Sequence, residues 1–324
     1  MRFRPLGTTG LAVSEIGFGA ATLGDEYFAL DPAEGTRAVH AAIDAGINFF
    51  DTSPYYGRTL SESRLGEALA GRRDKVVLCT KAGRYDYRGF DFSYARIMRS
   101  IDESLARLRT DYVDVLLAHD IEFGDEQQVL NETFPALREI QRQGKARFIG
   151  CSCLPLKLLA RVAVEAGADL VISYARYNLL VDDMDELLTP ALRQAGIGII
   201  LASPLHLGVL TDGTAPPPSW HPGARQVFEA AARAAAYCRE RGQDLSSIAL
   251  RFCLAHPYAA PVLSGMGTVA ELQRNLRALE ESTPAEVLDG VRAILAPVHN
   301  ATWQSGKPEY NDYPSFKFAG EALV

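Results

Sequence analysis

Eight short apolar runs recur along this chain of 324 residues, and longer amphipathic stretches lie between them. The runs are apolar almost throughout rather than at every second position, which is typical of parallel strands that are covered on both faces. The amphipathic stretches carry helix signals: one begins with Asp31 and Pro32 and ends at Gly46. The expected strands span residues 15–20, 47–50, 76–79, 113–118, 147–151, 170–174, 197–202 and 260–265.

This alternation predicts an α/β fold, a (β/α)8 TIM barrel that residues 1–324 form as a single domain. A doubly wound sheet is the alternative, but it would carry a Gly-x-Gly-x-x-Gly turn after its first strand, and the segment GFGAATLG lacks that spacing. The seventh and eighth strands are separated by a longer interval, which holds a Pro- and Gly-rich segment at 208–223 and two helical stretches. We therefore expect a barrel with extra helices, one of them after residue 283, and a long loop between strands 7 and 8.

The composition argues against several classes of protein. A net charge of −7 and an isoelectric point near 5.5 do not suit a chain that neutralises nucleic-acid phosphates. No apolar run approaches the roughly 18–20 residues of a membrane helix, and the N-terminal residues lack the apolar core of a signal peptide. The five scattered cysteines are typical of reduced thiols, and Cys151 and Cys153 have no second Cys/His pair at zinc spacing. We expect a cytoplasmic protein that acts on a small molecule, without a metal site, a nucleic acid or a membrane partner; no oligomeric state is predicted.

Polar side chains follow three successive expected strands. Asp51 comes after the second strand, Lys81 after the third and His119 after the fourth, while Tyr55 and Tyr56 lie on the loop that follows Asp51. The active site of a TIM barrel lies at the carboxyl ends of its strands, so these side chains should converge. Each of them alone has an ordinary explanation as a cap, a solvated lysine, a structural histidine or a packing aromatic. Their coincidence at three neighbouring strand ends favours a catalytic interpretation.

The chemistry of these groups is coherent. A tyrosine needs help to exchange a proton, because the pKa of a free phenol is near 10. A neighbouring Lys81 ammonium would favour the phenolate and lower that pKa, and Asp51 would keep the ammonium charged and in place. His119 can donate a hydrogen bond to a substrate oxygen on which negative charge develops. Such a set moves a proton on or off an alcohol oxygen, and the accompanying hydride requires a nicotinamide cofactor.

Motifs spread over nearly the whole chain resemble those of one family. They are GFGAATLG, NFFDTSPYYG, VVLCTKAG, GKARFIGCS, YNLL, ASPLHLGVLT and VLSGMGTVAELQRNL. In combination they identify the chain as similar to the aldo-keto reductases. The resemblance implies a catalytic tetrad of Asp51, Tyr56, Lys81 and His119. It also implies that Tyr56, directly before Gly57, is the proton carrier.

Further segments resemble one branch of that family, which contains L-galactose dehydrogenase and the D-threo-aldose (L-fucose) 1-dehydrogenases. They are KAGRYDYRGFDFSYARIMRSIDESL, LAHDIEFG, PPPSWHPG and ILAPVHNATWQSG. This resemblance implies NAD-dependent oxidation of an aldose, such as L-galactose or L-fucose, at C1 to the lactone. A pyridoxal 4-dehydrogenase and an NADPH-dependent carbonyl reductase are the alternatives within the family. A non-catalytic cofactor-binding regulatory protein, and a lyase or isomerase that uses Lys81 as a Schiff base, are the alternatives outside it.

The resemblance also implies where NAD binds. NADP-dependent members carry a Lys and an Arg at the positions of Gly265 and Glu271, and a glutamate would repel a 2′-phosphate but can accept hydrogen bonds from ribose hydroxyls. Arg274 is one turn away and leaves NADP as the alternative. The carboxamide and stacking contacts are altered at Cys153 and Ala202 as well as at Tyr174. The expected cofactor residues are Gly19, Asp51, Ser152, Tyr174, Ser203, Leu205, Gly208, Gly265, Met266, Gly267, Glu271, Arg274 and Asn275.

The substrate pocket is expected to be lined by loops at the same end of the barrel. Aromatic faces suit the C–H face of a sugar ring, and polar side chains suit its hydroxyl groups. Arg84, after the third strand, and Trp303, in the C-terminal tail, are further candidates for its walls. The expected substrate-binding residues are Tyr55, Tyr56, Asp120, His119, Glu122, His206 and Trp220.

Overall fold

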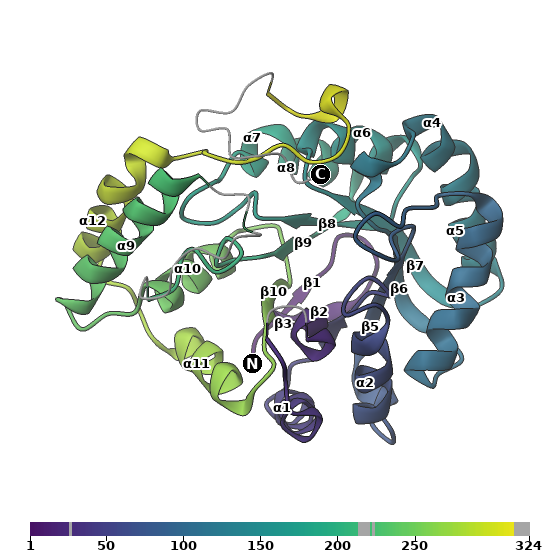
Figure 1. Ribbon diagram of the computed structural model, residues 1–324, viewed down its shortest axis with the longest axis horizontal. Coiled ribbons are helices and arrows are strands. Elements are labelled where there is room, and N and C mark those ends of the chain that lie inside the picture. Colours follow the sequence, from purple (N-terminus) through teal and green to yellow (C-terminus); the bar gives the residue numbers. More distant parts are fainter. Residues whose placement is uncertain (26–27, 213–220, 222–223, 314–324) are drawn as a thin grey trace.

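The computed structural model describes residues 1–25, 28–212, 221 and 224–313. In these ranges eight parallel strands close into a barrel, with helices outside it (Figure 1), so the predicted TIM barrel is confirmed. Each strand pairs with the next along the chain, and the last strand pairs with the first. The strands are β3 (Ile16–Gly19), β4 (Phe49–Asp51), β5 (Val77–Ala82), β6 (Val113–Ala118), β7 (Ala146–Cys153), β8 (Leu170–Tyr174), β9 (Gly198–Ala202) and β10 (Val262–Gly265).

A helix follows each barrel strand and packs on the outside of the barrel. Helix α3, for example, is capped by Ser93, whose side chain accepts a hydrogen bond from the backbone nitrogen of Arg96, and it buries Ile97, Ile101 and Leu105. These helices are α1 (Pro32–Asp44), α2 (Leu60–Ala68), α3 (Tyr94–Leu108), α5 (Phe134–Arg142), α6 (Leu156–Glu165), α8 (Thr189–Ala195), α10 (Leu245–Leu254) and α11 (Val269–Glu280).

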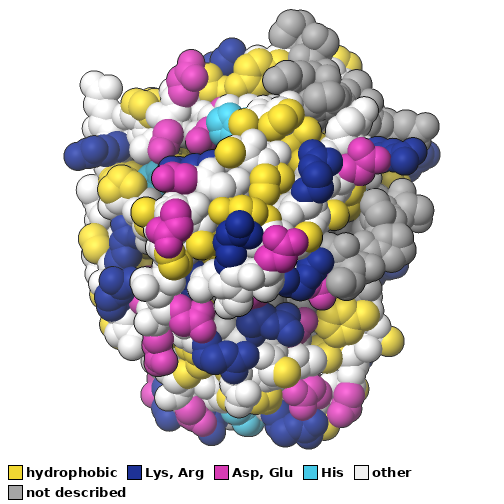
Figure 2. Space-filling view, turned by 90° about the vertical axis from the view of Figure 1, so that its left-hand side faces the viewer, with side chains coloured by type: hydrophobic (Ala, Val, Ile, Leu, Met, Phe, Trp, Pro, Cys, Tyr) yellow, Lys and Arg dark blue, Asp and Glu magenta, His cyan; other side chains and the backbone are white. Residues whose placement is uncertain are grey.

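Additional helices extend the barrel on one side and over its rim. Helix α9 (Arg225–Arg239) lies in the long interval between β9 and β10, as the sequence predicts, and packs against α12 (Ala285–Leu295), which follows the barrel (Figure 1). Two short helices, α4 (Glu126–Gln128) and α7 (Met184–Leu187), precede α5 and α8. Figure 2 shows the face of the molecule on which α9 and α12 lie, and acidic and basic side chains are interspersed on it. No helix in the described ranges is long and apolar enough to cross a membrane.

An antiparallel hairpin closes the end of the barrel at which the strands begin. Strands β1 (Phe3–Pro5) and β2 (Ala12–Ser14) form it, and its connecting turn meets the start of β9: a Cβ atom at Gly7 would lie 2.4 Å from the backbone nitrogen of Gly198. Side chains of the hairpin complete the apolar filling of the barrel. This interior cluster contains Leu6, Leu11, Val13, Phe49, Cys79, Val115, Leu117, Leu170, Ile172, Ile200, Ala260 and Leu263. The hairpin is not expected from the sequence, because its strands are three residues long and one contains a proline.

Leu6 should be important for stability because it fills the closed end of the barrel and is only 1% exposed. We expect Leu6→Ala to lower the free energy of unfolding by roughly 2–5 kcal/mol, the usual cost of an unfilled core site. Phe3→Ala on the same hairpin is the matched control, because Phe3 is 52% exposed. Urea denaturation followed by circular dichroism measures both changes. A loss in Leu6→Ala as small as the roughly 0.5 kcal/mol of an exposed position would contradict the role of Leu6 in the barrel core.

Candidate functional site

A buried ion pair lies at the carboxyl ends of β4 and β5. Lys81 and Asp51 are 2% and 4% exposed, and the lysine Nζ lies 2.7 Å from both carboxylate oxygens. The same nitrogen lies 2.8 Å from the Thr52 carbonyl and 3.1 Å from the hydroxyl of Tyr56. An ammonium has three hydrogens. When one points to the carboxylate and one to the carbonyl, the third points to the phenol oxygen.

The electrostatic environment keeps this lysine charged. Burial alone would lower the pKa of Lys81, but the Asp51 carboxylate, together with Tyr56 and Cys79, outweighs burial, and the net effect is to raise that pKa. Burial raises the pKa of Asp51, and the ammonium opposes this shift. The pair is therefore an ammonium and a carboxylate at neutral pH, with an N–H group directed at the oxygen of Tyr56.

A close contact between two backbone turns positions Tyr56. Gly57 has a φ of +59°, and a Cβ atom there would lie 2.0 Å from the carbonyl oxygen of Gly24. Gly24 ends the 3-10 turn η1 (Ala20–Gly24), which follows β3. Only glycine permits this approach of the two backbones. The contact holds the loop after β4 against the loop after β3.

Tyr55 points into a different contact from Tyr56. The guanidinium carbon of Arg84 lies 3.7 Å from the centre of the Tyr55 ring, and an Arg84 nitrogen lies 2.5 Å from a carboxylate oxygen of Asp120. The Tyr55 ring also lies 6.0 Å from the ring of His119. The structure thus places Tyr55 within a stack of charged and aromatic groups, whereas Tyr56 faces the ammonium of Lys81.

His119 stands across from Tyr56 at the end of β6. The two rings are nearly perpendicular, at 88°, with centres 5.8 Å apart. The histidine Nδ1 lies 3.0 Å from the hydroxyl of Ser53, and its Nε2 lies 3.6 Å from a carboxylate oxygen of Asp120. Burial lowers the pKa of His119 to about 3, although Asp120 opposes the shift. The imidazole is therefore neutral at physiological pH.

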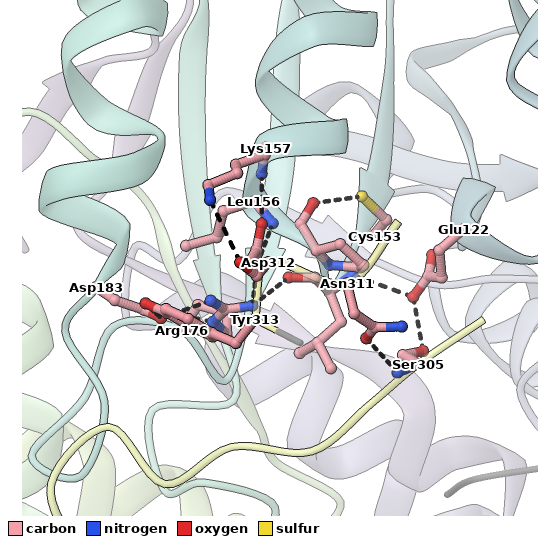
Figure 3. Close-up of polar contacts among 12 residues, drawn as sticks. Glu122, Cys153, Leu156, Lys157, Arg176, Asp183, Ser305, Asn311, Asp312 and Tyr313 are labelled. Carbon is pink, nitrogen blue, oxygen red and sulfur yellow. Dashed lines mark hydrogen bonds and ion pairs between the residues drawn. The ribbon is translucent and has the colours of Figure 1, made fainter. Parts of the chain in front are cut away.

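Glu122 is the second carboxyl group on the loop after β6, and it is completely buried. Burial, together with the charge of Asp120, raises the pKa of Glu122 to about 8. Its Oε1 lies 3.1 Å from the backbone nitrogen of Leu154, 3.4 Å from the Tyr174 hydroxyl and 2.9 Å from the Ser305 hydroxyl. Its Oε2 has no partner among the described residues. Glu122 thus joins the ends of β6, β7 and β8 to the C-terminal tail. Figure 3 shows its contact with Ser305 of the tail.

The tail after α12 crosses the rim of the barrel and is fastened by Asp312 (Figures 1 and 3). The Asp312 carboxylate accepts hydrogen bonds of 2.9 Å from the backbone nitrogens of Leu156 and Lys157, the first residues of α6. It also lies 2.8 Å from a guanidinium nitrogen of Arg176, which pairs with Asp183 as well. The residue before α6, Pro155, provides no side-chain cap. Asp312, which lies far along the chain, caps the N-terminus of this helix instead.

The tail also contains Trp303, which the sequence suggests as a wall of the substrate pocket. Trp303 is 2% exposed and packs with Leu154 and Ala175, and its ring lies 5.2 Å from that of His206. Burial lowers the pKa of His206 to about 3, and its Nδ1 lies 3.2 Å from the amide nitrogen of Asn178. His206 therefore contacts Asn178 and the Trp303 ring of the tail. Trp220 lies outside the described residues.

Several residues expected to bind the cofactor lie at the carboxyl ends of other barrel strands: Gly19 on β3, Ser152 on β7 and Gly265 on β10. Gly19 pairs with Gly265 in the register of β3 and β10. The hydroxyl of Ser152 accepts a hydrogen bond of 3.4 Å from the backbone nitrogen of Asp120. Cys153 belongs to the cluster between barrel and helices, and its thiol donates to the Pro155 carbonyl at 3.2 Å. Its side chain therefore serves packing and is not available as the second carboxamide contact.

Other expected cofactor residues form tight backbone turns. After β9, the backbone nitrogens of His206 and Gly208 donate to the carbonyls of Ser203 and Leu205 at 3.0 Å each. After β10, Met266 is fully buried and packs in the core. Along α11, the amide of Asn275 donates to the Ser264 hydroxyl at 3.2 Å.

Glu271 is already hydrogen-bonded to the backbone at the start of α11. Its Oε2 accepts hydrogen bonds from the backbone nitrogens of Gly267 and Thr268 at 2.8 and 3.0 Å, and the Thr268 hydroxyl accepts one from the nitrogen of Glu271. This reciprocal arrangement is a capping box. The carboxylate therefore occupies the helix N-terminus itself. Arg274 is exposed and has no hydrogen-bond or ion-pair partner in the described part of the chain.

Thr22 is a candidate that the sequence did not single out. It lies on η1, is 5% exposed, and its hydroxyl has no hydrogen-bond partner within the described ranges. A Cβ atom at Gly267 would lie 3.1 Å from the Cβ of Thr22, so this hydroxyl belongs to the surroundings of the β10 end. The Thr22 hydroxyl could therefore donate a hydrogen bond to a bound ligand. A nicotinamide dinucleotide fits this site, because it presents acceptor oxygens on its ribose and phosphate groups. The only signal of Thr22 in the sequence is its place in the turn after the first strand.

Removing the Asp312 carboxylate should loosen the tail. We expect Asp312→Ala to lower the free energy of unfolding by roughly 3–5 kcal/mol, because the buried guanidinium of Arg176 loses a partner. In a Trp220→Phe background the emission of Trp303 should also shift to longer wavelength. Asp44→Ala, which removes an exposed partner of Arg72, is the control and should cost less than about 1 kcal/mol. An unchanged Trp303 spectrum together with control-like stability would contradict the role of Asp312.

Comparisons with known proteins agree with this geometry. Residues 15–296 match the model of the Aldo/keto reductase family. L-galactose dehydrogenase of Arabidopsis thaliana is 44% identical over 316 residues, which cover 94% of this chain and 98% of that protein. D-threo-aldose 1-dehydrogenase of Pseudomonas sp is 32% identical over 314 residues, covering 89% and 94%. The solved structure of aldo-keto reductase AKR11C1 from Bacillus halodurans (holo form) matches with a TM-score of 0.76 at 26% identity, covering 96% of this chain and 100% of that one. The chain therefore belongs to the aldo-keto reductase family.

Proposed function

We propose that this enzyme oxidises the anomeric hydroxyl of an aldose, such as L-galactose or L-fucose, to the lactone with NAD. The observation that carries the proposal is the contact of 3.1 Å between the buried Lys81 ammonium and the hydroxyl of Tyr56. In the proposed reaction, Tyr56 is the proton acceptor, and it lies at the carboxyl end of the barrel. The similarity to L-galactose dehydrogenase and D-threo-aldose 1-dehydrogenase supports the choice of a sugar and of C1.

In this proposal Tyr56 is the general base of the oxidative direction. The ammonium of Lys81 stabilises its phenolate, and Asp51 keeps that ammonium charged and fixed. Tyr56 takes the proton of the C1 hydroxyl, while the bond between C1 and its hydrogen breaks and the C1=O bond of the lactone forms. A bound nicotinamide ring supplies the acceptor for the hydride that leaves C1.

His119 acts in the same step as a neutral hydrogen-bond donor. Because burial lowers its pKa to about 3, it does not compete with Tyr56 for the substrate proton at neutral pH. An N–H group of the imidazole can still stabilise negative charge that develops on the substrate oxygen. Arg84, Asp120 and Tyr55 form one packed group beside it and would face the sugar hydroxyls.

A Schiff-base enzyme is disfavoured by the surroundings of Lys81. A nucleophilic lysine must lose its proton, which requires a lowered pKa. Here the Asp51 carboxylate raises that pKa, and the Thr52 carbonyl and the Tyr56 oxygen use the remaining hydrogens. These contacts stabilise the charged form, which suits an electrostatic partner of Tyr56.

The preference for NAD rests on Glu271. Its carboxylate holds the backbone nitrogens at the start of α11, so negative charge already occupies the place at which a helix favours an anion. A 2′-phosphate brought to this end of the helix would be repelled. In this proposal Thr22, Gly19 and the backbone of residues 265–267 hold the dinucleotide, which carries no such phosphate in NAD.

The proton-transfer role predicts different outcomes for the two neighbouring tyrosines. We expect Tyr56→Phe to lower kcat for aldose oxidation by roughly 10²–10⁴-fold, the usual contribution of a general base. Tyr55→Phe keeps the ring under Arg84 and should lose far less. Stopped-flow absorbance of the reduced cofactor measures both. Retained activity in Tyr56→Phe together with lost activity in Tyr55→Phe would reverse the assignment.

The pH dependence should follow the same group. Tyr56 acts as a base only after it has lost its proton, so kcat for oxidation should rise with pH and level off once the phenol is ionised. Lactone reduction needs the protonated phenol and should show the opposite trend. Protonation of His119 lies far below this range, since its pKa is about 3. An oxidation rate that falls as pH rises from 6 to about 10, the pKa of a free tyrosine, would exclude Tyr56 as the base.

Cofactor choice is tested with a panel of aldoses and pyridoxal, each with NAD⁺ and NADP⁺. We expect an aldose and NAD⁺ to give the highest kcat/KM. Glu271→Gln should raise the relative kcat/KM for NADP⁺ about two- to fivefold, because it removes a charge worth roughly 0.5–1 kcal/mol at a helix end. Glu280→Gln, at the other end of α11, is the control. A clear preference of the unmodified enzyme for NADP⁺ would overturn the assignment.

A further inference from the structure

We propose that Ser53 fixes the neutral imidazole of His119 in the tautomer that carries its hydrogen on Nε2. The histidine then presents an N–H donor away from Ser53, as the proposed sugar oxidation requires. Only the use of this N–H group in sugar oxidation rests on the proposed function, because the tautomer itself is a property of the protein without substrate. Ser53 is thus a positioning residue that acts through His119.

The hydrogen bonds of the Ser53 hydroxyl determine the position of the hydrogen on His119. Ser53 is fully buried in the DTSPYYG loop, and its hydroxyl oxygen accepts a hydrogen bond of 3.1 Å from the backbone nitrogen of Tyr55. The hydroxyl has one hydrogen to donate. Its other partner in the described ranges is Nδ1 of His119, at 3.0 Å. If the hydroxyl donates to Nδ1, that nitrogen carries a lone pair, and the imidazole hydrogen lies on Nε2.

The opposite tautomer would leave two groups poorly satisfied. With the hydrogen on Nδ1, the imidazole would donate to Ser53, and the hydroxyl hydrogen would have no acceptor among the described residues. A buried hydroxyl without an acceptor is costly. The lone pair of Nε2 would at the same time face the carboxylate of Asp120.

Asp120 favours the same tautomer from the other side of the ring. Its Oδ2 lies 3.6 Å from Nε2 of His119, and an Arg84 nitrogen lies 2.5 Å from that oxygen and holds it in place. A carboxylate oxygen attracts an N–H group and repels a nitrogen lone pair. The distance is longer than a hydrogen bond, so the Nε2 hydrogen is not bound to Asp120 and stays available to a ligand.

Ser53 also connects the two groups that act on the substrate oxygen in the proposed reaction. Its carbonyl accepts a hydrogen bond of 3.1 Å from the backbone nitrogen of Tyr56, while its hydroxyl contacts His119. One residue therefore orients the loop that carries the proton acceptor and selects the donor nitrogen of the imidazole. As Tyr56 takes the proton, the Nε2 hydrogen would stabilise the charge on the same oxygen.

Nitrogen NMR of the protein labelled with ¹⁵N-histidine tests the tautomer directly. The chain has six histidines, and the signals of His119 are assigned by their loss in His119→Gln. We expect a protonated Nε2 and an unprotonated Nδ1 in the unmodified protein, and a mixture of tautomers in Ser53→Ala. A protonated Nδ1 in the unmodified protein, or an unchanged pattern in Ser53→Ala, would overturn the proposal.

Ser61→Ala is the matched structural control. Ser61 is another fully buried serine of this region, and its hydroxyl contacts the Ala20 carbonyl at 2.7 Å and the Thr52 hydroxyl at 2.8 Å. Its loss should reduce stability about as much as the loss of the Ser53 hydroxyl. The nitrogen pattern of His119 should stay unchanged. A shift of that pattern in Ser61→Ala equal to the shift in Ser53→Ala would show a general effect of loop packing instead.

Kinetics test the consequence for the reaction. We expect Ser53→Ala to lower kcat about five- to tenfold with little change in KM, the effect of one hydrogen bond that acts in the transition state. Ser53→Thr, which keeps the hydroxyl, should restore most of kcat. An unchanged kcat in Ser53→Ala would overturn the positioning role. If no aldose is oxidised by the unmodified enzyme, the proposed function fails, whereas the nitrogen pattern still decides the tautomer.

Discussion

The buried ion pair between Lys81 and Asp51 sets the conditions for the rest of the site. A charge removed from water is tolerated only when its partner and its hydrogen bonds are complete. The ammonium meets this requirement with a carboxylate, a backbone carbonyl and the oxygen of Tyr56. The contacts that keep Lys81 charged therefore also point one of its N–H groups at the hydroxyl oxygen of Tyr56. The register of β4 and β5 makes them possible, because it places Asp51 beside Cys79, two residues before Lys81.

Around this pair, segments that are distant in the chain complete the rim of the barrel. Glu122 links three strand ends to the tail through Tyr174, Leu154 and Ser305. Asp312 caps α6 and neutralises Arg176, so the same tail stabilises the frame on which Glu122 rests. The loop after β4 is held in turn by its close contact with η1. These three sets of contacts therefore hold loops of the site against neighbouring segments of the chain.

Much of the fold follows from the sequence, since a strand covered on both faces must be apolar throughout. This pattern located all eight barrel strands, and the Pro- and Gly-rich interval marked the place of the extra helices. The hairpin β1–β2 was not predicted, because its strands are too short to show a hydrophobic period. Its role depends on its contacts with the barrel interior. The convergence of Asp51, Tyr56, Lys81 and His119 was also predictable, because parallel strands end on one side of a barrel.

The sequence by itself therefore determined the barrel, the family and the residues gathered at its carboxyl end. Only the tertiary structure decided what those residues contact. It placed Tyr56, which the resemblance had already marked as the proton carrier, beside the ammonium, and it placed Tyr55 beneath Arg84. It showed that Glu271 is engaged in a capping box, and it brought Thr22, Ser53 and Asp312 into the account. The physical reason is that a strand pattern depends on neighbours along the chain, whereas the partner of a buried polar group depends on segments that only the closed barrel brings together.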